Sequence, residues 1–421
     1  MEPFVLTIFM NVAIVSPEFP PFTNWGGIAT FNSNLAQLLS KSNYKVHVIT
    51  FDGTGAEERE VNLDNIVIHY VRFKTHFKII NLLYYRFPLS LARSLIKKFL
   101  PSTLFILDWN FFSLFMFKKL YEKYSFKIIF APTYHAPSLF ISMFFPKIMT
   151  VLHAQGPQEE LNKFEEISMD SKIQAWLENV YMINFSQKII ACSNYLYKKI
   201  IKRFPKIKKK VLYIHNFINT KNYRNRNTLD RKNIVFLGRL EYRKGIDILV
   251  KVFISLAKNN KDIKLWLIGR NGNFFPLGNS KVPFARWFSE LKIPRQIRDR
   301  IYQYNNIDDK VTLLQLLVKL KGIAVFPSRY EPFGFVHIEA MAIGYLVLGS
   351  YNGGGVEIIN DGVDGYLSSP SFRSVFDNIN KILNLSNAEA KLMSRKAIIK
   401  AQLTFDISSA KPRMSEIINN I

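Results

Sequence analysis

Short runs of apolar, mostly β-branched residues alternate with longer helical patterns along this chain of 421 residues, and this alternation restricts the fold more than any other feature. Residues 12–15 form the first apolar run, and a loop then leads to Gly26-Gly27. The helical pattern that follows places these apolar residues on one face: Ile28, Phe31, Leu35, Leu38 and Leu39. Strands that alternate with helices build parallel sheets covered by helices. The sequence therefore predicts an α/β fold.

The alternation starts again near residue 216, which divides the chain into two parts. Expected strands lie at 46–50, 66–71, 127–130, 148–152 and 188–191 in the first part, and at 234–237, 264–268, 323–326 and 346–349 in the second. Asp247 is a candidate N-cap for the helix after 234–237. The polar stretch 211–227 lacks periodicity and suits a hinge. We predict an α/β domain over 1–215, a second over 216–385, and a helical segment over 386–421 that packs back towards the first.

The net charge of +25 favours anionic partners, because a strongly basic surface attracts nucleic acid, anionic lipid or phosphorylated compounds. Between residues 70 and 150 the basic side chains far outnumber the acidic ones, which are Asp108 and Glu122. The same stretch is rich in phenylalanine, at positions 99, 105, 111, 112, 115, 117, 144 and 145. Two interpretations stay open: contact with an anionic membrane surface, and an ordinary Phe-rich core inside a basic domain.

Several classes of protein are disfavoured. The most apolar stretch, 104–117, contains Asp108, Asn110 and Ser113 and falls short of the roughly 20 apolar residues that span a bilayer. Asn11 interrupts the N-terminal apolar run, which we interpret as a first strand and not a signal peptide. The single cysteine, Cys192, rules out an intramolecular disulfide and is expected in the core. We predict a cytoplasmic protein, soluble or peripheral on the inner face of the membrane, with no nucleic-acid partner.

Two carboxylates in the stretch 327–339 form the most informative pair. Glu331 lies in a loop that Pro332 stiffens, and Glu339 lies about one turn into the helix that follows. Carboxylates placed in this way accept hydrogen bonds from paired hydroxyls of a sugar or a ribose. Gly334 allows the backbone to approach a ligand, and free N–H groups at the start of a helix favour anions. A surface loop with one helix carboxylate is the simpler alternative.

Cationic and glycine residues at other strand ends supply further candidates. Arg239 follows the strand 234–237 and Lys244 precedes the next helix, where the pair suits a diphosphate; solvated surface charges are the alternative. Gly26-Gly27 precedes a helix but lacks the GxGxxG spacing of nicotinamide-binding domains. His153 follows the strand 148–152, and a lone histidine there is more often structural than catalytic. We find no zinc pattern, Walker loop, GxSxG elbow or DxD tripeptide.

Taken together and in order, these features resemble glycosyltransferase family 4, a group of retaining enzymes with the GT-B fold. The match covers most of the chain and is strongest at 234–250 and 328–367. The second stretch includes Asn352-Gly353-Gly354-Gly355-Val356-Glu357 and Asp361-Gly362-Val363-Asp364-Gly365. The spacing from Glu331 to Glu339 matches the glutamate-x7-glutamate motif of the family. The resemblance implies two Rossmann-like domains that face each other across a cleft.

The resemblance also implies a role for each candidate residue. Glu331 would contact donor-sugar hydroxyls, beside backbone groups of Phe333, Gly334 and Phe335, and Glu339 would hold the ribose hydroxyls. Arg239 and Lys244 would bind the donor diphosphate, and Gly26 and Gly27 would line it from the opposite domain. His153 would lie near the reacting centre, so His153 and Glu331 are the catalytic candidates. The departing phosphate would take the proton of the acceptor, and neither a metal nor another cofactor is expected.

Some features depart from the family pattern. Residues 273–310 are unusually basic and aromatic, and 311–323 looks shortened where the family has a strand, a loop and a helix. Asn216-Phe217-Ile218-Asn219 replaces the more usual Asn-Gly-x-Asp hinge. The expected function is retaining transfer of a hexosyl group from a nucleotide diphosphate sugar to a glycan or a lipid-linked acceptor, in cell-surface polysaccharide or glycolipid synthesis. The alternatives are a non-catalytic polyanion- or membrane-binding protein and a nucleotide-sugar epimerase of the same fold.

Overall fold

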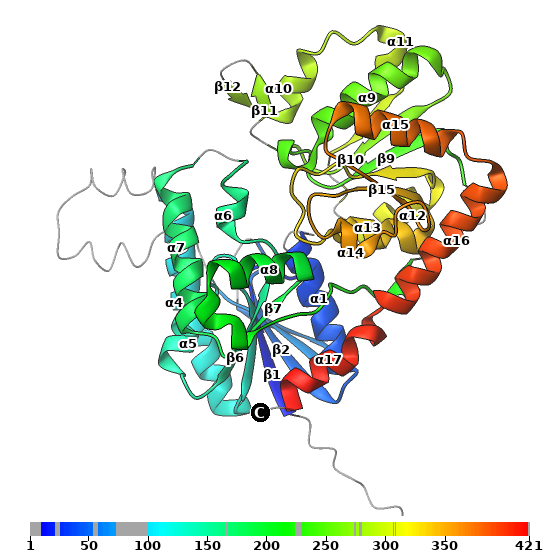
Figure 1. Ribbon diagram of the computed structural model, residues 1–421. Coiled ribbons are helices and arrows are strands. Elements are labelled where there is room, and N and C mark those ends of the chain that lie inside the picture. Colours follow the sequence, from blue (N-terminus) through cyan, green and yellow to red (C-terminus); the bar gives the residue numbers. More distant parts are fainter. Residues whose placement is uncertain are drawn as a thin grey trace, which may run out of the picture. The chain divides into compact units, whose positions relative to one another are not determined.

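The structure of the chain is a computed structural model that describes residues 10–21, 26–53, 58–72, 100–164, 167–223, 229–272, 275–277, 280–305, 307 and 309–419 (Figure 1). The chain divides into two compact units. The first unit comprises Met1–Cys192, Tyr197–Ile214 and Lys411–Ile421, and the second comprises Ser193–Leu196 and His215–Ala410. The expected helical segment 386–421 is thus divided between the two units, because only residues from Lys411 onwards belong to the first.

The first unit is built on an eight-stranded sheet with the order β3-β4-β2-β1-β5-β6-β7-β8. The strands are β1 (Met10–Val15), β2 (Tyr44–Thr50), β3 (Arg59–Leu63), β4 (Ile66–Tyr70), β5 (Ile128–Pro132), β6 (Met149–Ala154), β7 (Lys188–Ala191) and β8 (Val211–Tyr213). All neighbours are parallel except β3 and β4. The predicted strands of this half are confirmed. No strand was predicted at β3, an edge strand whose residues are largely exposed. The prediction that the hinge begins at 211 is wrong, because β8 lies there.

Helices pack on this sheet, and the longest is anchored at its first turn. The helices are α1 (Gly27–Ser40), α4 (Pro101–Tyr124), α5 (Leu139–Phe144), α6 (Gln158–Leu161), α7 (Met169–Asn184), α8 (Asn194–Arg203), the 3-10 turn η1 (Pro205–Lys210) and α17 (Ile407–Asn419), which crosses from the second unit into the first. The Asp170 carboxylate at the start of α7 accepts hydrogen bonds from the backbone N–H groups of Ser102 (3.0 Å) and Thr103 (2.9 Å). A carboxylate at a helix N-terminus satisfies unpaired donors and stabilises the helix dipole.

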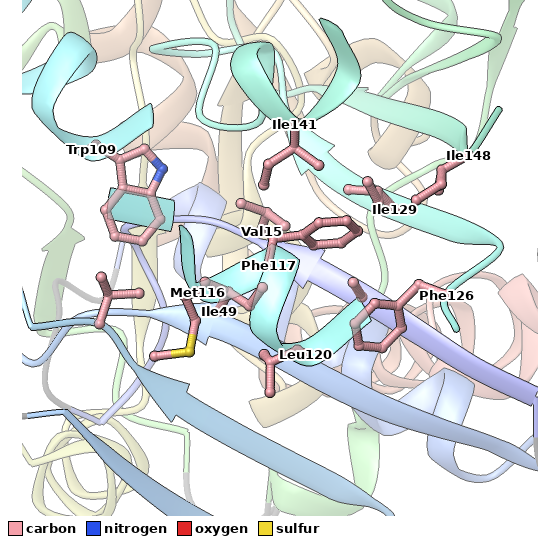
Figure 2. Close-up of a cluster of buried hydrophobic side chains, with 12 residues drawn as sticks. Val15, Ile49, Trp109, Met116, Phe117, Leu120, Phe126, Ile129, Ile141 and Ile148 are labelled. Carbon is pink, nitrogen blue, oxygen red and sulfur yellow. The ribbon is translucent and has the colours of Figure 1, made fainter. Parts of the chain in front are cut away.

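Part of the phenylalanine-rich stretch forms the core of the first unit. Phe117 and Trp109 of α4 pack with Phe126, Ile129 and the other buried side chains drawn in Figure 2. On the same helix Phe115 is 57% exposed, and Phe144 of α5 is 67% exposed. The buried phenylalanines thus fit the interpretation as an ordinary core. The exposed ones leave the interpretation as a membrane-contacting surface open. Phe99 and the basic residues between 73 and 98 lie outside the described residues.

Among the helices of the described residues, none is long and apolar enough to cross a membrane. Cys192 is buried, as the apolar run around it predicts.

The second unit contains a six-stranded parallel sheet with the order β13-β10-β9-β14-β15-β16. The strands are β9 (Asn233–Leu237), β10 (Lys264–Ile268), β13 (Ile301–Tyr304), β14 (Ile323–Val325), β15 (Leu346–Ser350) and β16 (Tyr366–Ser368), with a separate hairpin of β11 (Phe275–Leu277) and β12 (Ser280–Val282). The 3-10 turns are η2 (Thr220–Asn222) and η3 (Tyr242–Lys244). The helices are α9 (Ile246–Asn259), α10 (Phe284–Ser289), α11 (Arg295–Arg298), α12 (Lys310–Lys319), α13 (Phe335–Ile343), α14 (Gly355–Ile358), α15 (Phe372–Leu383) and α16 (Asn387–Thr404).

The structure shows the local form of two stretches of the second unit and corrects one prediction. Asp247 is not the N-cap of α9: the residue before the helix is Gly245, whose φ of +71° suits glycine, and a side chain there would collide with the carbonyl of Pro327. Residues 311–323, expected to be a shortened strand, loop and helix, contain most of helix α12 and the first residue of β14. Strand β13 precedes them, and α12 begins at Lys310 because the Asp309 carboxylate caps its first turn.

Candidate functional site

Three loops of the second unit meet at the carboxyl ends of neighbouring strands. Arg239 and Lys244 follow β9, Glu331 follows β14, and Gly353 follows β15. Backbone hydrogen bonds join the loops: Arg329 N–H donates to the Arg243 carbonyl (2.8 Å), and Gly354 N–H donates to the Glu331 carbonyl (2.9 Å). In open α/β sheets this edge is where ligands bind, because helix N-termini and loop backbone converge there.

Lys244 and Glu331 form an ion pair within this edge, with the Lys244 ammonium donating to Oε2 of Glu331. Both side chains are largely buried. Burial by itself raises the pKa of the Glu331 carboxyl, but the neighbouring Lys244 and Arg243 outweigh burial and hold this pKa below its ordinary value. Glu331 is therefore a carboxylate at neutral pH. The structure brings together two predicted site residues that lie 87 positions apart in the chain.

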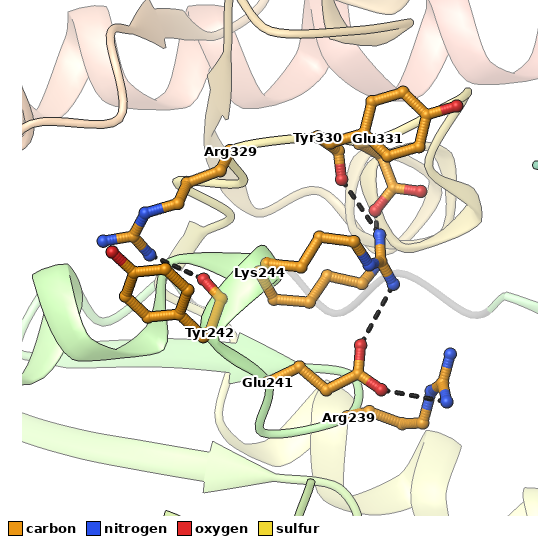
Figure 3. A network of polar contacts seen from close by, with 8 residues as sticks. Arg239, Glu241, Tyr242, Lys244, Arg329, Tyr330 and Glu331 are labelled. Atoms are coloured by element: carbon orange, nitrogen blue, oxygen red, sulfur yellow. Dashed lines mark hydrogen bonds and ion pairs between the residues drawn. The ribbon is translucent and has the colours of Figure 1, made fainter. Parts of the chain in front are cut away.

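Glu241 holds two arginines beside this pair (Figure 3). Its Oε1 accepts from Arg239 (2.9 Å) and its Oε2 from Arg243 (3.1 Å). Arg243 is buried and also donates to the Tyr330 carbonyl (2.9 Å). The Arg239 side chain is 62% exposed and keeps donors available for a ligand. Arg243 fixes the loop, and Arg239 is the arginine that solvent can reach.

Arg329 closes the other side of the network. Its guanidinium meets the Asp247 carboxylate in a two-pronged contact, at 2.7 and 2.8 Å, and donates to the Tyr242 carbonyl at 2.6 Å. It also lies over the Tyr242 ring, 3.7 Å from the centroid. Such fork-shaped pairs fix geometry as well as charge. The complete network contains four cations, Arg239, Arg243, Lys244 and Arg329, against three carboxylates, Glu241, Asp247 and Glu331. One net positive charge remains, which favours an anion.

The loop after Glu331 turns into helix α13 at a strained glycine. Gly334 has φ of +106°, and a side chain there would collide with the His337 ring. Phe333 and Phe335 flank this glycine and are buried, so they offer backbone groups and not side chains at the surface. Glu339 lies on α13, half-buried, and its Oε1 accepts a hydrogen bond from the Tyr223 hydroxyl at 2.8 Å.

The buried histidine of α13 is structural. His337 Nδ1 donates to the Gly334 carbonyl at 3.2 Å, which stabilises the turn into the helix. Burial lowers the pKa of His337 to about 4, so the ring is neutral at physiological pH. A neutral ring beside Glu331 adds no charge to the network.

The candidates of the first unit lie at the start of α1 and at the end of β6. Gly26 is the N-cap of α1 and Gly27 its first residue, so the backbone N–H groups of this first turn are free of intrahelical partners. His153 is buried near the end of β6, and its Nε2 is 2.8 Å from Oδ1 of Asn32 on α1. The structure therefore links the histidine to the helix that the glycines begin.

Asn32 also determines the tautomer of His153. The Asn32 amide nitrogen donates to the Glu18 carbonyl (3.1 Å), so its oxygen faces the ring and Nε2 carries the proton. Nδ1 then holds a lone pair, and it has no hydrogen-bond partner among the described residues. Burial lowers the pKa of His153 to about 3, so the ring is neutral. The neutral ring therefore donates from Nε2 to Asn32 and offers Nδ1 as a hydrogen-bond acceptor.

Residues of these arrangements that the sequence motifs did not single out include Glu241, Arg243, Arg329, Asn32 and Tyr223. Glu241 and Arg243 have a local signal, since they lie between Arg239 and Lys244, whereas Asn32, Tyr223 and Arg329 have partners far away in the chain. Within the described ranges, no group of three or more His, Cys, Asp and Glu side chains is placed to hold a metal ion.

Two sequence families match the chain, one for each half. Residues 25–222 match the family "Glycosyltransferase Family 4", and residues 218–400 match "Glycosyl transferases group 1". Among individual relatives, spore coat protein SA of Bacillus subtilis is 24% identical over 51% of this chain and 60% of its own length. The alpha-maltose-1-phosphate synthase of Mycobacterium tuberculosis is 26% identical over 53% of this chain and 58% of its own length. The chain thus spans about three fifths of these relatives.

Solved structures show the same fold over the full chain. Sucrose-phosphate synthase from Thermosynechococcus elongatus superposes with a TM-score of 0.73 at 19% identity, covering 98% of both chains. The Anabaena protein HepE, solved in complex with UDP-glucose, gives a TM-score of 0.66 at 17% identity over 98% of this chain and 100% of its own. Both halves of the chain match the family, the fold is that of these structures, and the chain belongs to the family 4 glycosyltransferases with the GT-B fold.

Proposed function

We propose that this chain transfers a hexosyl group from a nucleotide diphosphate sugar to a glycan or lipid-linked acceptor, with retention of the anomeric configuration. The observation that carries the proposal is the Lys244–Glu331 pair, set among three arginines at the carboxyl edge of the second sheet. A diphosphate needs convergent cations, and a sugar needs a carboxylate that accepts hydroxyls. This edge supplies both within one network.

The ion pair suggests how the donor is received. The diphosphate competes with Glu331 for the Lys244 ammonium, while Arg239 supplies donors from its exposed side chain. Glu331 is then released to accept hydroxyls of the sugar. The charge that develops on the leaving diphosphate is stabilised by cations already held in place. The departing phosphate takes the proton of the acceptor hydroxyl, so the reaction needs no carboxylate nucleophile, metal or other cofactor. His153 remains the second catalytic candidate, because its buried Nδ1 can accept a hydrogen bond and has no partner among the described residues.

Relatives support a nucleotide-sugar donor. HepE binds UDP-glucose, and starch synthase IV from Arabidopsis thaliana has been solved with ADP and acarbose. A non-catalytic polyanion-binding protein would explain the net charge of +25. It would not explain why a carboxylate is held beside a lysine at this sheet edge. An epimerase of the same fold would bind the nucleotide sugar but release it as a free sugar or a new nucleotide sugar, without glycosylating an acceptor.

A panel of UDP-, GDP- and ADP-sugars is expected to raise the melting temperature of the wild-type chain for one nucleotide class. A ligand that binds only the folded state stabilises it by about 2.7 kcal/mol at 100 times its Kd. Glu339→Gln should weaken this response, because the carboxylate is the expected ribose acceptor. Glu290→Gln, at an exposed position of the same unit, is the control and should respond as wild type. The measurement is a thermal-shift titration of the three proteins.

The outcomes of the panel separate the candidate functions. A stabilising donor that is then transferred to a sugar acceptor supports the transferase, and a product with inverted anomeric configuration would contradict retention. Conversion of the nucleotide sugar without an acceptor would favour the epimerase. If no donor stabilises the wild type and the chain binds polyanions with a steep salt dependence, the binding protein is favoured.

For the acceptor, we infer a lipid-linked substrate reached by contact of the first unit with an anionic membrane surface on the inner face. Apolar side chains are exposed on three helices of this unit, at Phe115 of α4, Phe144 of α5 and Trp176 of α7. Exposed lysines accompany them on α4 and nearby, at positions 118, 119, 123, 127 and 147. Exposed aromatic residues insert among headgroups, and lysines attract anionic lipid.

Wild-type protein is expected to sediment with anionic liposomes at low salt, and Phe115→Ser combined with Phe144→Ser should weaken binding about a hundredfold or more, since each buried phenylalanine is worth about 1.5–3 kcal/mol. Leu403→Ser is the matched control, because Leu403 is 75% exposed on α16 of the second unit and should not matter. Neutral liposomes test the charge contribution. Absence of wild-type binding at low salt would eliminate the membrane proposal and leave the transferase proposal standing.

A further inference from the structure

Tyr223 reaches the second glutamate of the motif from a distant part of the chain. Its hydroxyl donates to Glu339 Oε1 at 2.8 Å, across 116 residues of sequence. Only 7% of Tyr223 is exposed, whereas Glu339 on α13 is half-buried. A buried donor thus meets one oxygen of a carboxylate whose residue is itself partly exposed. No sequence motif assigns a role to this tyrosine.

The backbone that carries Tyr223 is held rigidly. Tyr223 N–H donates to the Thr220 carbonyl (3.0 Å), and the Thr220 amide and hydroxyl both donate to the Asp406 carboxylate (3.0 and 2.5 Å). Ile218 exchanges backbone hydrogen bonds with Phe405 and Ile407, each at 2.9 Å. Two segments of the second unit are therefore bonded together just before the tyrosine. A side chain mounted in this way has a fixed position from which it can orient another.

The chemistry of the pair suits positioning and not neutralisation. Burial and the Glu339 carboxylate both raise the pKa of Tyr223, so the phenol stays protonated and donates. A neutral donor fixes the orientation of the Glu339 carboxylate and does not neutralise its negative charge. The hydrogen bond uses one lone pair of Oε1, and the other lone pairs of the two oxygens remain as acceptors. Two adjacent hydroxyls need such a pair of acceptors, held in one orientation.

We propose that Tyr223 is a positioning residue that orients the Glu339 carboxylate to accept the two hydroxyls of the ribose in a nucleoside diphosphate. This inference rests on the proposed function, because it takes the donor to be a nucleotide sugar. Partners that orient a ligand-binding side chain commonly determine much of its affinity. The tyrosine acts through Glu339 and does not touch the reacting atoms.

The test compares Tyr223→Phe with wild type for two ligands. One is the nucleoside diphosphate of the base found in the donor panel, and the other is its 2′,3′-dideoxy analogue, which lacks both ribose hydroxyls. Loss of a hydrogen bond to a charged group weakens an interaction by about tenfold. Tyr223→Phe should therefore raise the Kd of the ribonucleotide about tenfold and leave that of the dideoxy analogue unchanged. In transfer assays KM for the donor should rise while kcat is largely kept.

Two further variants keep the result interpretable. Tyr345→Phe also removes a buried tyrosine hydroxyl of this unit, one that donates to the Leu317 carbonyl at 2.6 Å, and should bind both nucleotides as wild type. Glu339→Gln should lose the preference for ribose, and adding Tyr223→Phe to it should change nothing further. Equal weakening of both nucleotides by Tyr223→Phe would overturn the inference.

The failures of the two proposals are distinguishable. If wild type binds the nucleotide and Glu339→Gln weakens it, but Tyr223→Phe binds as wild type, the positioning role is wrong and the proposed function stands. If wild type binds no nucleoside diphosphate, the proposed function fails and this inference fails with it.

Discussion

Replacing Glu331 by glutamine is expected to lower kcat/KM for transfer by about 10²–10³-fold, the size of effect seen when one preorganised electrostatic contact is removed. The amide keeps the shape of the side chain but loses the charge that holds Lys244. Without that charge the donor sugar loses the charged acceptor of its hydroxyls. Steady-state kinetics with the donor found by the thermal-shift panel give the measurement.

The control for this variant is Glu160→Gln in the first unit. Glu160 also pairs with lysines, Lys163 at 2.8 Å and Lys199 at 2.7 Å, but lies outside the candidate site. It should keep wild-type kinetics, because partly exposed ion pairs contribute about 0–1 kcal/mol to stability and nothing to the reaction. A fully active Glu331→Gln protein would remove Glu331 from the mechanism, and a loss shared by Glu160→Gln would point to a general effect on the fold.

The largest expected loss of stability comes from Phe117→Ala, which should cost about 3–5 kcal/mol of unfolding free energy. Phe117 is completely buried and packs against Phe126 and Phe145, with ring centroids 5.4 and 5.2 Å apart. Truncation leaves a cavity lined by rigid neighbours from α4 and the sheet, which cannot all move in to fill it. Urea unfolding followed by circular dichroism gives the shift in midpoint.

Phe115→Ala on the same helix is the matched control. Its ring is 57% exposed, so the same chemical change two residues away should cost less than about 0.5 kcal/mol. Equal losses for the two variants would mean that the packing drawn in Figure 2 does not determine the stability of this unit. A small loss of unfolding free energy for both variants would lead to the same conclusion.

The ten expected strands and the helices α1 and α9 were predictable because their signals are local. An apolar run such as 234–237 indicates a strand that is buried on both faces of a parallel sheet. The apolar face of α9 is predicted by the 3.6-residue period of its apolar side chains. The errors occurred where a local rule competes with a distant partner. Asp247 looks like a cap, but Arg329 takes its carboxylate, 82 residues away in sequence. Strand β3 has no apolar run because its residues lie at the edge of the sheet.

The sequence by itself determined the α/β class, the two-part organisation, the strand ends that Arg239, Lys244 and Glu331 follow, and the helix that carries Glu339, since all these depend on neighbours within a few residues. Only the tertiary structure decided how the charges are paired. Lys244 meets Glu331, Arg329 meets Asp247, and Tyr223 meets Glu339 across 87, 82 and 116 residues. Such pairings depend on which loops the sheet order makes neighbours, and side-chain chemistry alone permits many others.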